Sequence, residues 1–395
     1  MATIRRELFP GEVLFQQGDP AGSAWLVERG EVVLQVESEA GPQPPLDFGP
    51  GELIGELALL DGAPHRATAV ARGEAVLLAI DAQQFDERVQ ASDPVVRALL
   101  DSVRTRMRAL QEALPAGTPL PLEDQPCDDP EDREGIRKIH FETQLREALA
   151  HQSLEVHYQP IMDIAAGRVC GYEALVRWTH ASLGQVSPAD FIRLAEETSL
   201  IVPLGEYVLD QAIGVLRGLH ATHGDDLPSV AVNLSARQLV QPGMARQVVA
   251  RVAAAGLPRG ALKLEVTESR MLDYAPVAAV MNHCRANGIP FALDDFGTGY
   301  SNLTHLHALE FEYLKVDQAF SRHMLDSPRA MAIVEAIVAM GHGLGAQVIM
   351  EGVETRAQLD ALRRMGVEHA QGWLVGKAQP ATAVLSGAAA AISPL

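Results

Sequence analysis

The chain has 395 residues, a length that favours two domains, or three small ones, each large enough to bury a core. Its 51 acidic side chains outnumber the 32 basic ones and give a formal net charge of −19. This acidic excess disfavours a chain that binds nucleic acid or an anionic membrane surface through charge, so an anionic ligand would need bound cations or local arginines.

The first part of the chain, from Gly11 to Ile80, has the pattern of short strands separated by turns. The strand-like runs are EVLFQQGDP, AWLVERGEVVLQV and RATAVARGEAVLLAI, and the Pro- and Gly-rich stretch GPQPPLDFGPG lies between the second and the third. Such spacing is typical of an antiparallel, jelly-roll-like domain.

A helical pattern follows from Asp81 to Leu114, with apolar residues that step alternately by four and three positions. These residues are Val96, Leu100, Val103, Met107, Leu110 and Leu114. The heptad seam fits a parallel dimer coil, and it equally fits a helix that packs on its own β-domain. We assign residues 1–114 to the first domain and the Pro- and Asp-rich residues 115–135 to a linker.

Beyond the linker, strand-like runs alternate with helical ones over residues 136–395. The strand-like runs are LEVHYQPI, CGYEALVRW, VAVNL, LKLEVT, PFALDD, EYLKVD, QVIMEGV and HAQGWL. Eight strands with mostly helical crossovers predict a (β/α)8 barrel. Only MDIAAGR joins the first two strands, and a connection of hairpin length predicts that one of them runs antiparallel.

Polar residues gather at the carboxyl ends of these strands, where barrels place their active sites. They are Glu173, Asn233, Glu265, Asp294, Asp295, Lys315, Asp317, Glu351 and Gln371. One such residue alone is best explained as a solvated strand end or an ion pair. Converging carboxylates resist ionising together unless cations lie between them, and oxygen ligands with one amide suit Mg²⁺ or Mn²⁺.

The stretch DDFGTGYSNL begins with two adjacent carboxylates, Asp294 and Asp295. One of them can bridge two ions while the other holds the second ion, which is the arrangement used in two-metal hydrolysis of phosphoesters. The glycines Gly297 and Gly299 then allow a mobile loop to close nearby.

The motifs now resemble a known family. EALVRW, NLS at Asn233, EVTE at Glu265, DDFGTGYSNL, KVD at Lys315, EGVE at Glu351 and QGWLVGKAQP stand in the order of the EAL family of cyclic di-GMP phosphodiesterases. The similarity runs from about Ile136 to Ala381. It implies a cyclic di-GMP substrate, hydrolysis to linear pGpG and two Mg²⁺ or Mn²⁺ ions.

The resemblance also implies roles for individual residues. One metal would be bound by Glu173, Asn233, Glu265 and Asp294, and the other by Asp294, Asp295 and Glu351. Lys315 would hold and polarise the attacking water, Glu354 would support the site and Glu268 would anchor the DDFGTGYSNL loop. We expect Gln159, Arg177, Asp317 and Gln371 to face the substrate. A catalytically silent cyclic di-GMP receptor is the alternative, and the missing metal ligand that would mark it is not found.

In the first domain, GPGELIGELALLDGAPHRATA places Gly55, Glu56, Leu57 and Arg66 near two strand ends. A guanidinium can bind a compact phosphate while a carboxylate accepts from a sugar hydroxyl. Judged on Glu56 and Arg66 alone, a surface pair beside a turn is the better explanation.

The wider pattern, from about Leu8 to Leu114, resembles the cyclic nucleotide-binding domain of catabolite-activator-type regulators. The resemblance implies that Arg66 contacts the cyclic phosphate and Glu56 the ribose, with backbone amides near Gly55 and Ala67. It makes cAMP the expected ligand and Arg108 and Gln111 candidates for contacts with adenine. His65 stands before Arg66, where the family commonly has Pro directly before Arg.

We therefore expect a cytoplasmic signalling enzyme, a homodimer, in which cAMP regulates hydrolysis of cyclic di-GMP. No helix-turn-helix pattern follows the heptad helix, which disfavours a DNA-binding regulator. The three cysteines lie far apart without a CxxC pair, and no run of about 18 uncharged apolar residues predicts a membrane span. The first domain is alternatively only a dimerisation platform.

Overall fold

A computed structural model describes residues 5–38, 41–42, 44–82, 130–180, 183–267, 274–297 and 309–387, together with residues 85 and 89. The chain divides into two compact units, which are described separately below. One comprises Met1–Ala148 with Glu197–Ser199, and the other comprises Leu149–Glu196 with Leu200–Leu395.

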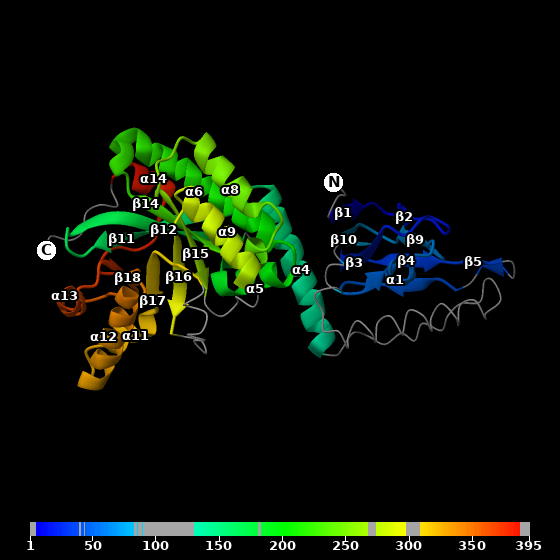
Figure 1. The fold of residues 1–395 in the computed structure, drawn as a ribbon. Helices are drawn as coiled ribbons and strands as arrows, with labels where there is room; N and C mark the ends of the chain where they lie inside the picture. The colour runs from blue at the N-terminus through cyan, green and yellow to red at the C-terminus, as the bar shows by residue number, and fades with distance from the viewer. Residues whose placement is uncertain are drawn as a thin grey trace. The chain divides into compact units, whose positions relative to one another are not determined.

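The first unit contains two four-stranded antiparallel sheets (Figure 1). One has the order β1 (Arg5–Leu8), β10 (Ala75–Asp81), β3 (Ser23–Arg29), β8 (Leu53–Ile54). The other has the order β2 (Val13–Phe15), β9 (Thr68–Ala71), β4 (Val32–Gln35), β7 (Leu46–Phe48), and β5 (Glu37–Ser38) pairs separately with β6 (Gly41–Pro42). Side chains from both sheets form one buried cluster, as alternation along half-buried strands requires. The jelly-roll prediction is confirmed.

Two helices of this unit can be given bounds within the described residues. The short helix α1 (Glu56–Asp61) begins after Gly55 and ends before Gly62, and both glycines have left-handed backbones. The long helix α4 (Pro130–Ala150) begins inside the predicted linker, so Pro130–Gly135 is helical. Proline and acidic residues favour a first helical turn, which explains this start. The heptad seam from Val96 to Leu114 lies outside the described residues. The domain boundaries given above, 1–114, 115–135 and 136–395, stay predictions.

The second unit is a closed barrel (Figure 1). Its strands are β11 (Glu155–Asp163), β12 (Arg168–His180), β14 (Ser229–Leu234), β15 (Leu262–Thr267), β16 (Phe291–Phe296), β17 (Tyr313–Val316), β18 (Gln347–Met350) and β19 (His369–Gln371). They run parallel from β12 to β19, and β11 closes the barrel antiparallel to both. The prediction of an eight-stranded barrel with one antiparallel strand is confirmed.

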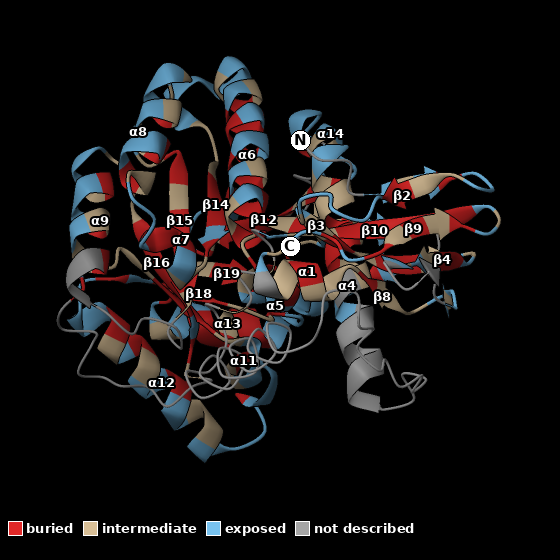
Figure 2. Ribbon diagram, turned by 90° about the vertical axis from the view of Figure 1, so that its right-hand side faces the viewer, coloured by how far each residue is buried: buried red, intermediate tan, exposed pale blue. Residues whose placement is uncertain are grey.

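Helices connect and cover these strands. They are α5 (Pro188–Glu197), α6 (Ile201–His223), α7 (Ala236–Leu239), α8 (Met244–Ala254), α9 (Tyr274–Ala286), α11 (Gln318–His323), α12 (Pro328–Gly343), α13 (Arg356–Met365) and α14 (Ala381–Leu385). Smaller elements are η1 (Gly224–Asp226), β13 (Gly184–Val186) and β20 (Gln379–Pro380). The strands are largely buried and the helices expose their outer faces (Figure 2). None of the helices described is both long and apolar enough to cross a bilayer.

Candidate active site

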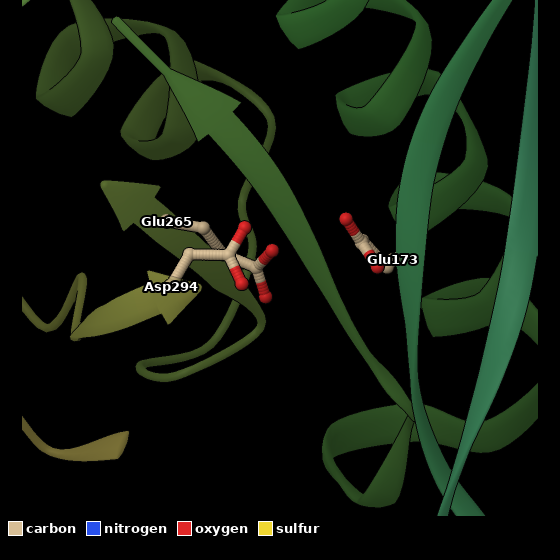
Figure 3. Close-up of side chains that lie close together, drawn as sticks. All are labelled: Glu173, Glu265 and Asp294. Carbon is tan, nitrogen blue, oxygen red and sulfur yellow. The ribbon is translucent and has the colours of Figure 1, made fainter. Parts of the chain in front are cut away.

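The register of the barrel brings polar side chains from different strands into its interior. Glu173 on β12 lies opposite Ala231 on β14, and Asn233, two residues further on, lies opposite Glu265 on β15. Because side chains alternate along a strand, Glu173, Asn233 and Glu265 share the inner face. In Figure 3, Glu265 lies beside Asp294, and Glu173 points toward both from β12.

A β-bulge in β16 explains how two successive residues, Asp294 and Asp295, reach one site. The pairing of β16 with β17 shifts between Leu293 and Phe296, which leaves one extra residue on β16. Asp295 takes up the bulge with φ 56°, a left-handed conformation that is uncommon for residues other than glycine. Regular alternation would send adjacent carboxylates to opposite faces, and the bulge keeps them together.

Lys315 on β17 occupies the centre of this group of carboxylates. Its Nζ lies 2.8 Å from Glu265, 2.9 Å from Asp294, 2.9 Å from Glu351 and 3.4 Å from Glu173. The contact with Asp294 Oδ1 is a charge contact outside hydrogen-bond geometry. Only 1% of the Lys315 surface is exposed, so these carboxylates compensate its charge.

Burial and mutual repulsion set the charge state of the cluster. Burial lowers the pKa of Lys315, but the four neighbouring carboxylates outweigh this effect and raise it well above its ordinary value. Burial raises the pKa of Glu351 to about 7 and that of Glu265 well above its ordinary value. It also raises the pKa of Asp295, with help from the charge of Asp294. One lysine therefore does not neutralise the cluster.

Two amides hold Glu173 in its ionised form. Asn233 Nδ2 donates to one of its carboxylate oxygens at 2.9 Å, and Gln371 Nε2 donates to the other at 2.7 Å. Burial raises the pKa of Glu173, but Lys315 and these two donors outweigh burial, so its net pKa lies below the ordinary value. Gln371 Oε1 is buried without a hydrogen-bond partner. Both Glu173 and Gln371 thus face a place that can accept a ligand.

The donor set fits hard divalent cations. Glu173, Glu265 and Asp294 each offer one oxygen within 4.8 Å of the others, and Asp294, Asp295 and Glu351 form a second such group. The two groups share Asp294, as expected for a carboxylate that bridges two ions. Oxygen-only donors without cysteine or histidine favour Mg²⁺ or Mn²⁺ over Zn²⁺.

The residues predicted to contact substrate lie around this cluster. Gln159 on β11 is the cross-strand partner of Glu173. Arg177 lies four residues after Glu173 on β12. Because side chains alternate along a strand, it faces the same side of the sheet as Glu173. Asp317 Oδ1 accepts from the Ala319 amide as the N-cap of α11, and its charge is one of those that raise the pKa of Asp295 after burial and Asp294.

Two predicted supporting residues are not brought to the cluster by any described contact. The Glu354 side chain is exposed, and its backbone amide donates to Gln358. Glu268 lies outside the described residues, as does the loop beyond Gly297. Their predicted supporting roles stay predictions.

In the first unit, Gly55, Glu56 and Leu57 open α1 as the cassette pattern suggests, and Ala67 is buried before β9. Burial raises the pKa of Glu56. Arg66 is exposed, whereas the neighbouring His65 is buried. Arg108 and Gln111 lie outside the described residues. Sequence reasoning assigned no role to His65, although its unusual place before Arg66 was a visible signal.

Comparison with known families shows which family this chain belongs to. A family model for the EAL domain matches residues 142–378, more than half of the chain. The chain belongs to the EAL domain family. A second family model, for the cyclic nucleotide-binding domain, matches residues 5–92, which contain the jelly roll.

Curated relatives of the EAL domain include two proteins from Pseudomonas aeruginosa. The bifunctional diguanylate cyclase/cyclic di-GMP phosphodiesterase MucR is 39% identical over 65% of this chain and 37% of its own length. The cyclic di-GMP phosphodiesterase NbdA is 39% identical over 63% of this chain and 32% of its own length. The chain spans about a third of the length of the first curated relatives it matches.

Solved structures match both parts of the chain. The EAL enzyme Bd1971 in its cAMP-bound form is 29% identical, with a TM-score of 0.62, and the match covers 97% of this chain and 99% of that one. Bd1971 has also been solved with cAMP and cyclic di-GMP bound. The PaMucR phosphodiesterase in complex with c-di-GMP is 39% identical over 62% of this chain and 99% of that one, with a TM-score of 0.58.

Proposed function

We propose that this chain is a cyclic di-GMP phosphodiesterase that opens its substrate to linear pGpG. The observation that carries the proposal is the pair of carboxylate groups joined by Asp294 at the carboxyl ends of the barrel strands. The predicted acids Glu173, Glu265, Asp295 and Glu351 all belong to it. Relatives named as phosphodiesterases of this substrate support the same activity.

The chain's own residues prepare the site for phosphoester hydrolysis. Two Mg²⁺ or Mn²⁺ ions, when bound, supply a nucleophile at neutral pH and stabilise the departing 3′-oxygen. Asn233 and Gln371 keep Glu173 ionised and oriented. Lys315 keeps its positive charge, because its pKa is raised well above its ordinary value, and we assign it the role of holding and polarising the attacking water. Arg177 lies on the same face and offers a planar donor to a phosphate.

The first domain is proposed to be a cAMP sensor, because it matches the cyclic nucleotide-binding domain and because the relative Bd1971 binds cAMP. In this proposal cAMP binds two states of the chain with different affinity and so shifts the population toward one of them. The heptad helix within residues 1–114 and the linker 115–135 would transmit the change in a homodimer, with the EAL domain over 136–395. These boundaries, the dimer and a cytoplasmic location are predictions from the sequence.

The test is turnover of cyclic di-GMP by the purified chain with Mg²⁺, with and without cAMP, following pGpG by chromatography. We expect turnover that chelation of the metal abolishes and that cAMP changes. An Asp294→Asn variant, which removes the shared carboxylate, is expected to form no pGpG. Binding of cyclic di-GMP without turnover by the unmodified chain would instead identify a receptor. Turnover insensitive to cAMP would reduce the first domain to a dimerisation platform.

A further inference from the structure

His65 and Arg66 are adjacent, yet the structure places their side chains in opposite environments. Only 6% of the His65 surface is exposed, whereas Arg66 is exposed. Every second residue after His65 also faces inward, since Ala69 and Ala71 of β9 belong to the core between the two sheets. Arg66 forms no hydrogen bond or ion pair within residues 5–82 that the structure describes. The guanidinium therefore points away from the interior that the imidazole faces.

The His65 ring is held in place by its neighbours. It stacks on Phe15 with ring centroids 3.7 Å apart and an interplanar angle of 12°. Its backbone amide donates to the Asp19 carbonyl at 2.8 Å, and its carbonyl accepts from the Gly18 amide at 2.7 Å. Packing on one face and two backbone hydrogen bonds together fix which way residue 65 points.

The edge of the ring reaches the start of the cassette. A Cβ built on Gly55, whose φ is 79°, would lie 3.0 Å from His65 Cε1. Residue 55 therefore needs both the backbone freedom and the small size of glycine. Glu56 follows directly and begins α1. Within the described residues no hydrogen bond or ion pair engages the ring nitrogens of His65. The Cε1 edge of the imidazole is thus directed at Gly55, one of the residues expected to surround a cyclic nucleotide.

We propose that His65, and not Arg66, is the side chain that the first domain presents to the phosphate of a cyclic nucleotide. The proposal rests on the proposed sensor function and specifies which residue confers it. An imidazole near a phosphate differs from a guanidinium in one decisive way, because it is a cation only when protonated. A phosphate contact through His65 therefore makes affinity depend on pH, whereas a contact through Arg66 does not.

The charged surroundings give the direction of this dependence. Burial lowers the pKa of His65, and the charge of Asp19 only partly opposes that effect. Glu56 follows Gly55 at the start of α1, and burial raises its pKa. The ring is therefore neutral at pH 8. Binding of an anion should become tighter as the pH falls toward 6, because the bound phosphate stabilises the imidazolium.

The experiment is calorimetric titration of the full chain with cAMP at pH 6 and pH 8. For the unmodified chain we expect affinity about tenfold or more higher at pH 6. His65→Gln should lose this pH dependence and bind weakly at both values. His65→Arg should bind at pH 8 at least as tightly as the unmodified chain does at pH 6. Arg66→Gln should keep both the affinity and the pH dependence within about twofold.

Each combination of results either supports or overturns the assignment of His65 as the phosphate contact. Loss of binding in Arg66→Gln, with an unchanged pH profile in His65→Gln, would overturn the proposal and leave the sensor function standing. Binding gained only by His65→Arg would support residue 65 as the phosphate position and count against cAMP as the native ligand. No binding by the unmodified chain or by His65→Arg would overturn both the sensor function and this proposal. Turnover of cyclic di-GMP, measured separately, is independent of all three results.

Discussion

The barrel and the jelly roll handle charge in opposite ways. In the barrel, Lys315 is almost fully buried among four carboxylates that come from four different strands or strand ends. In the jelly roll, the arginine of the cassette, Arg66, is exposed, and His65 takes the inward position. Both regions carry the residue types that a family pattern leads one to expect. The difference shows that the residue types in a motif predict a binding site only where the backbone also determines which way their side chains point.

The reason lies in the local backbone. Strand register fixes the direction of Glu173, Asn233 and Glu265 through regular pairing of β12, β14 and β15. His65 and Arg66 precede β9, where two backbone hydrogen bonds of His65 with Gly18 and Asp19, and no longer a continuous strand ladder, hold the chain. A shift by one residue there exchanges which side chain points inward.

After the complete loss expected for Asp294→Asn, the largest expected effect comes from Glu265→Gln. The substitution keeps the shape of a buried carboxyl but removes its ability to ionise beside a cation. We expect turnover to fall by about a hundredfold or more, because one oxygen ligand of the shared cluster is lost. The melting temperature should fall less than in a variant that loses Lys315, since Glu173, Asp294 and Glu351 still compensate the ammonium. Initial rates and thermal melts measure the two effects.

A matched control for Glu265→Gln is Glu335→Gln, at an exposed position of α12. This control should leave both turnover and melting temperature unchanged, as surface substitutions generally do. If Glu265→Gln turned over substrate as fast as the control variant, the barrel cluster would not be the reaction centre.

The next largest effect is on stability, from Lys315→Met. Removing the buried ammonium leaves Glu265, Asp294 and Glu351 without their compensating charge, which should cost about 3–5 kcal/mol of the free energy of unfolding. Added Mg²⁺ should restore more stability to this variant than to the unmodified chain, because a cation then replaces the ammonium. Thermal melts with Mg²⁺ and with chelator measure this difference.

Lys138→Met is the control for Lys315→Met. Lys138 pairs with Glu197 at 3.2 Å while half of its side chain is exposed, so its loss should cost under about 1 kcal/mol and leave the response to Mg²⁺ as it is in the unmodified chain. Equal melting temperatures for the two variants in chelator would show that Lys315 does not balance the cluster.

A smaller effect tests the bulge that joins Asp294 to Asp295. Asp295 has φ 56°, which asparagine tolerates and alanine does not, so Asp295→Ala should be about 1 kcal/mol less stable than Asp295→Asn. Urea denaturation compares the pair, and equal stabilities would contradict backbone strain at this position. Gln152, with φ 51°, lies in the exposed turn between α4 and β11, and Gln152→Gly should raise stability.

Much of the barrel could be predicted from the sequence. The eight strand-like runs are all strands, and the short connection between β11 and β12 gave the antiparallel strand correctly. Strand ends of such a barrel converge by construction, so the gathering of Glu173, Glu265, Asp294, Asp295 and Glu351 followed from their positions.

Other features depend on three-dimensional packing that spacing does not encode. The contact of Lys315 with four carboxylates requires the lengths and tilts of several strands at once. The bulge at Asp295 adds one residue to β16 and leaves no unusual residue type in the sequence. Pro130 was assigned to a linker, because Pro and Asp mark both linkers and first helical turns. Likewise, nothing in the letters APHRATA tells which of His65 and Arg66 faces inward.

The smallest expected effect concerns His65 without any ligand. Burial lowers its pKa in the folded state below the value of about 6.5 in the unfolded chain, so the unfolded chain binds more protons near pH 6. The stability that the neutral ring contributes is therefore present above pH 6.5 and is lost as the pH falls through the folded pKa. Hydrogen exchange of the β2 and β9 amides should accelerate over this range relative to its rate in His65→Gln, after correction for intrinsic exchange. Barrel amides serve as the internal control, and an identical pH profile in the two proteins would mean that the His65 ring is not desolvated by its packing on Phe15.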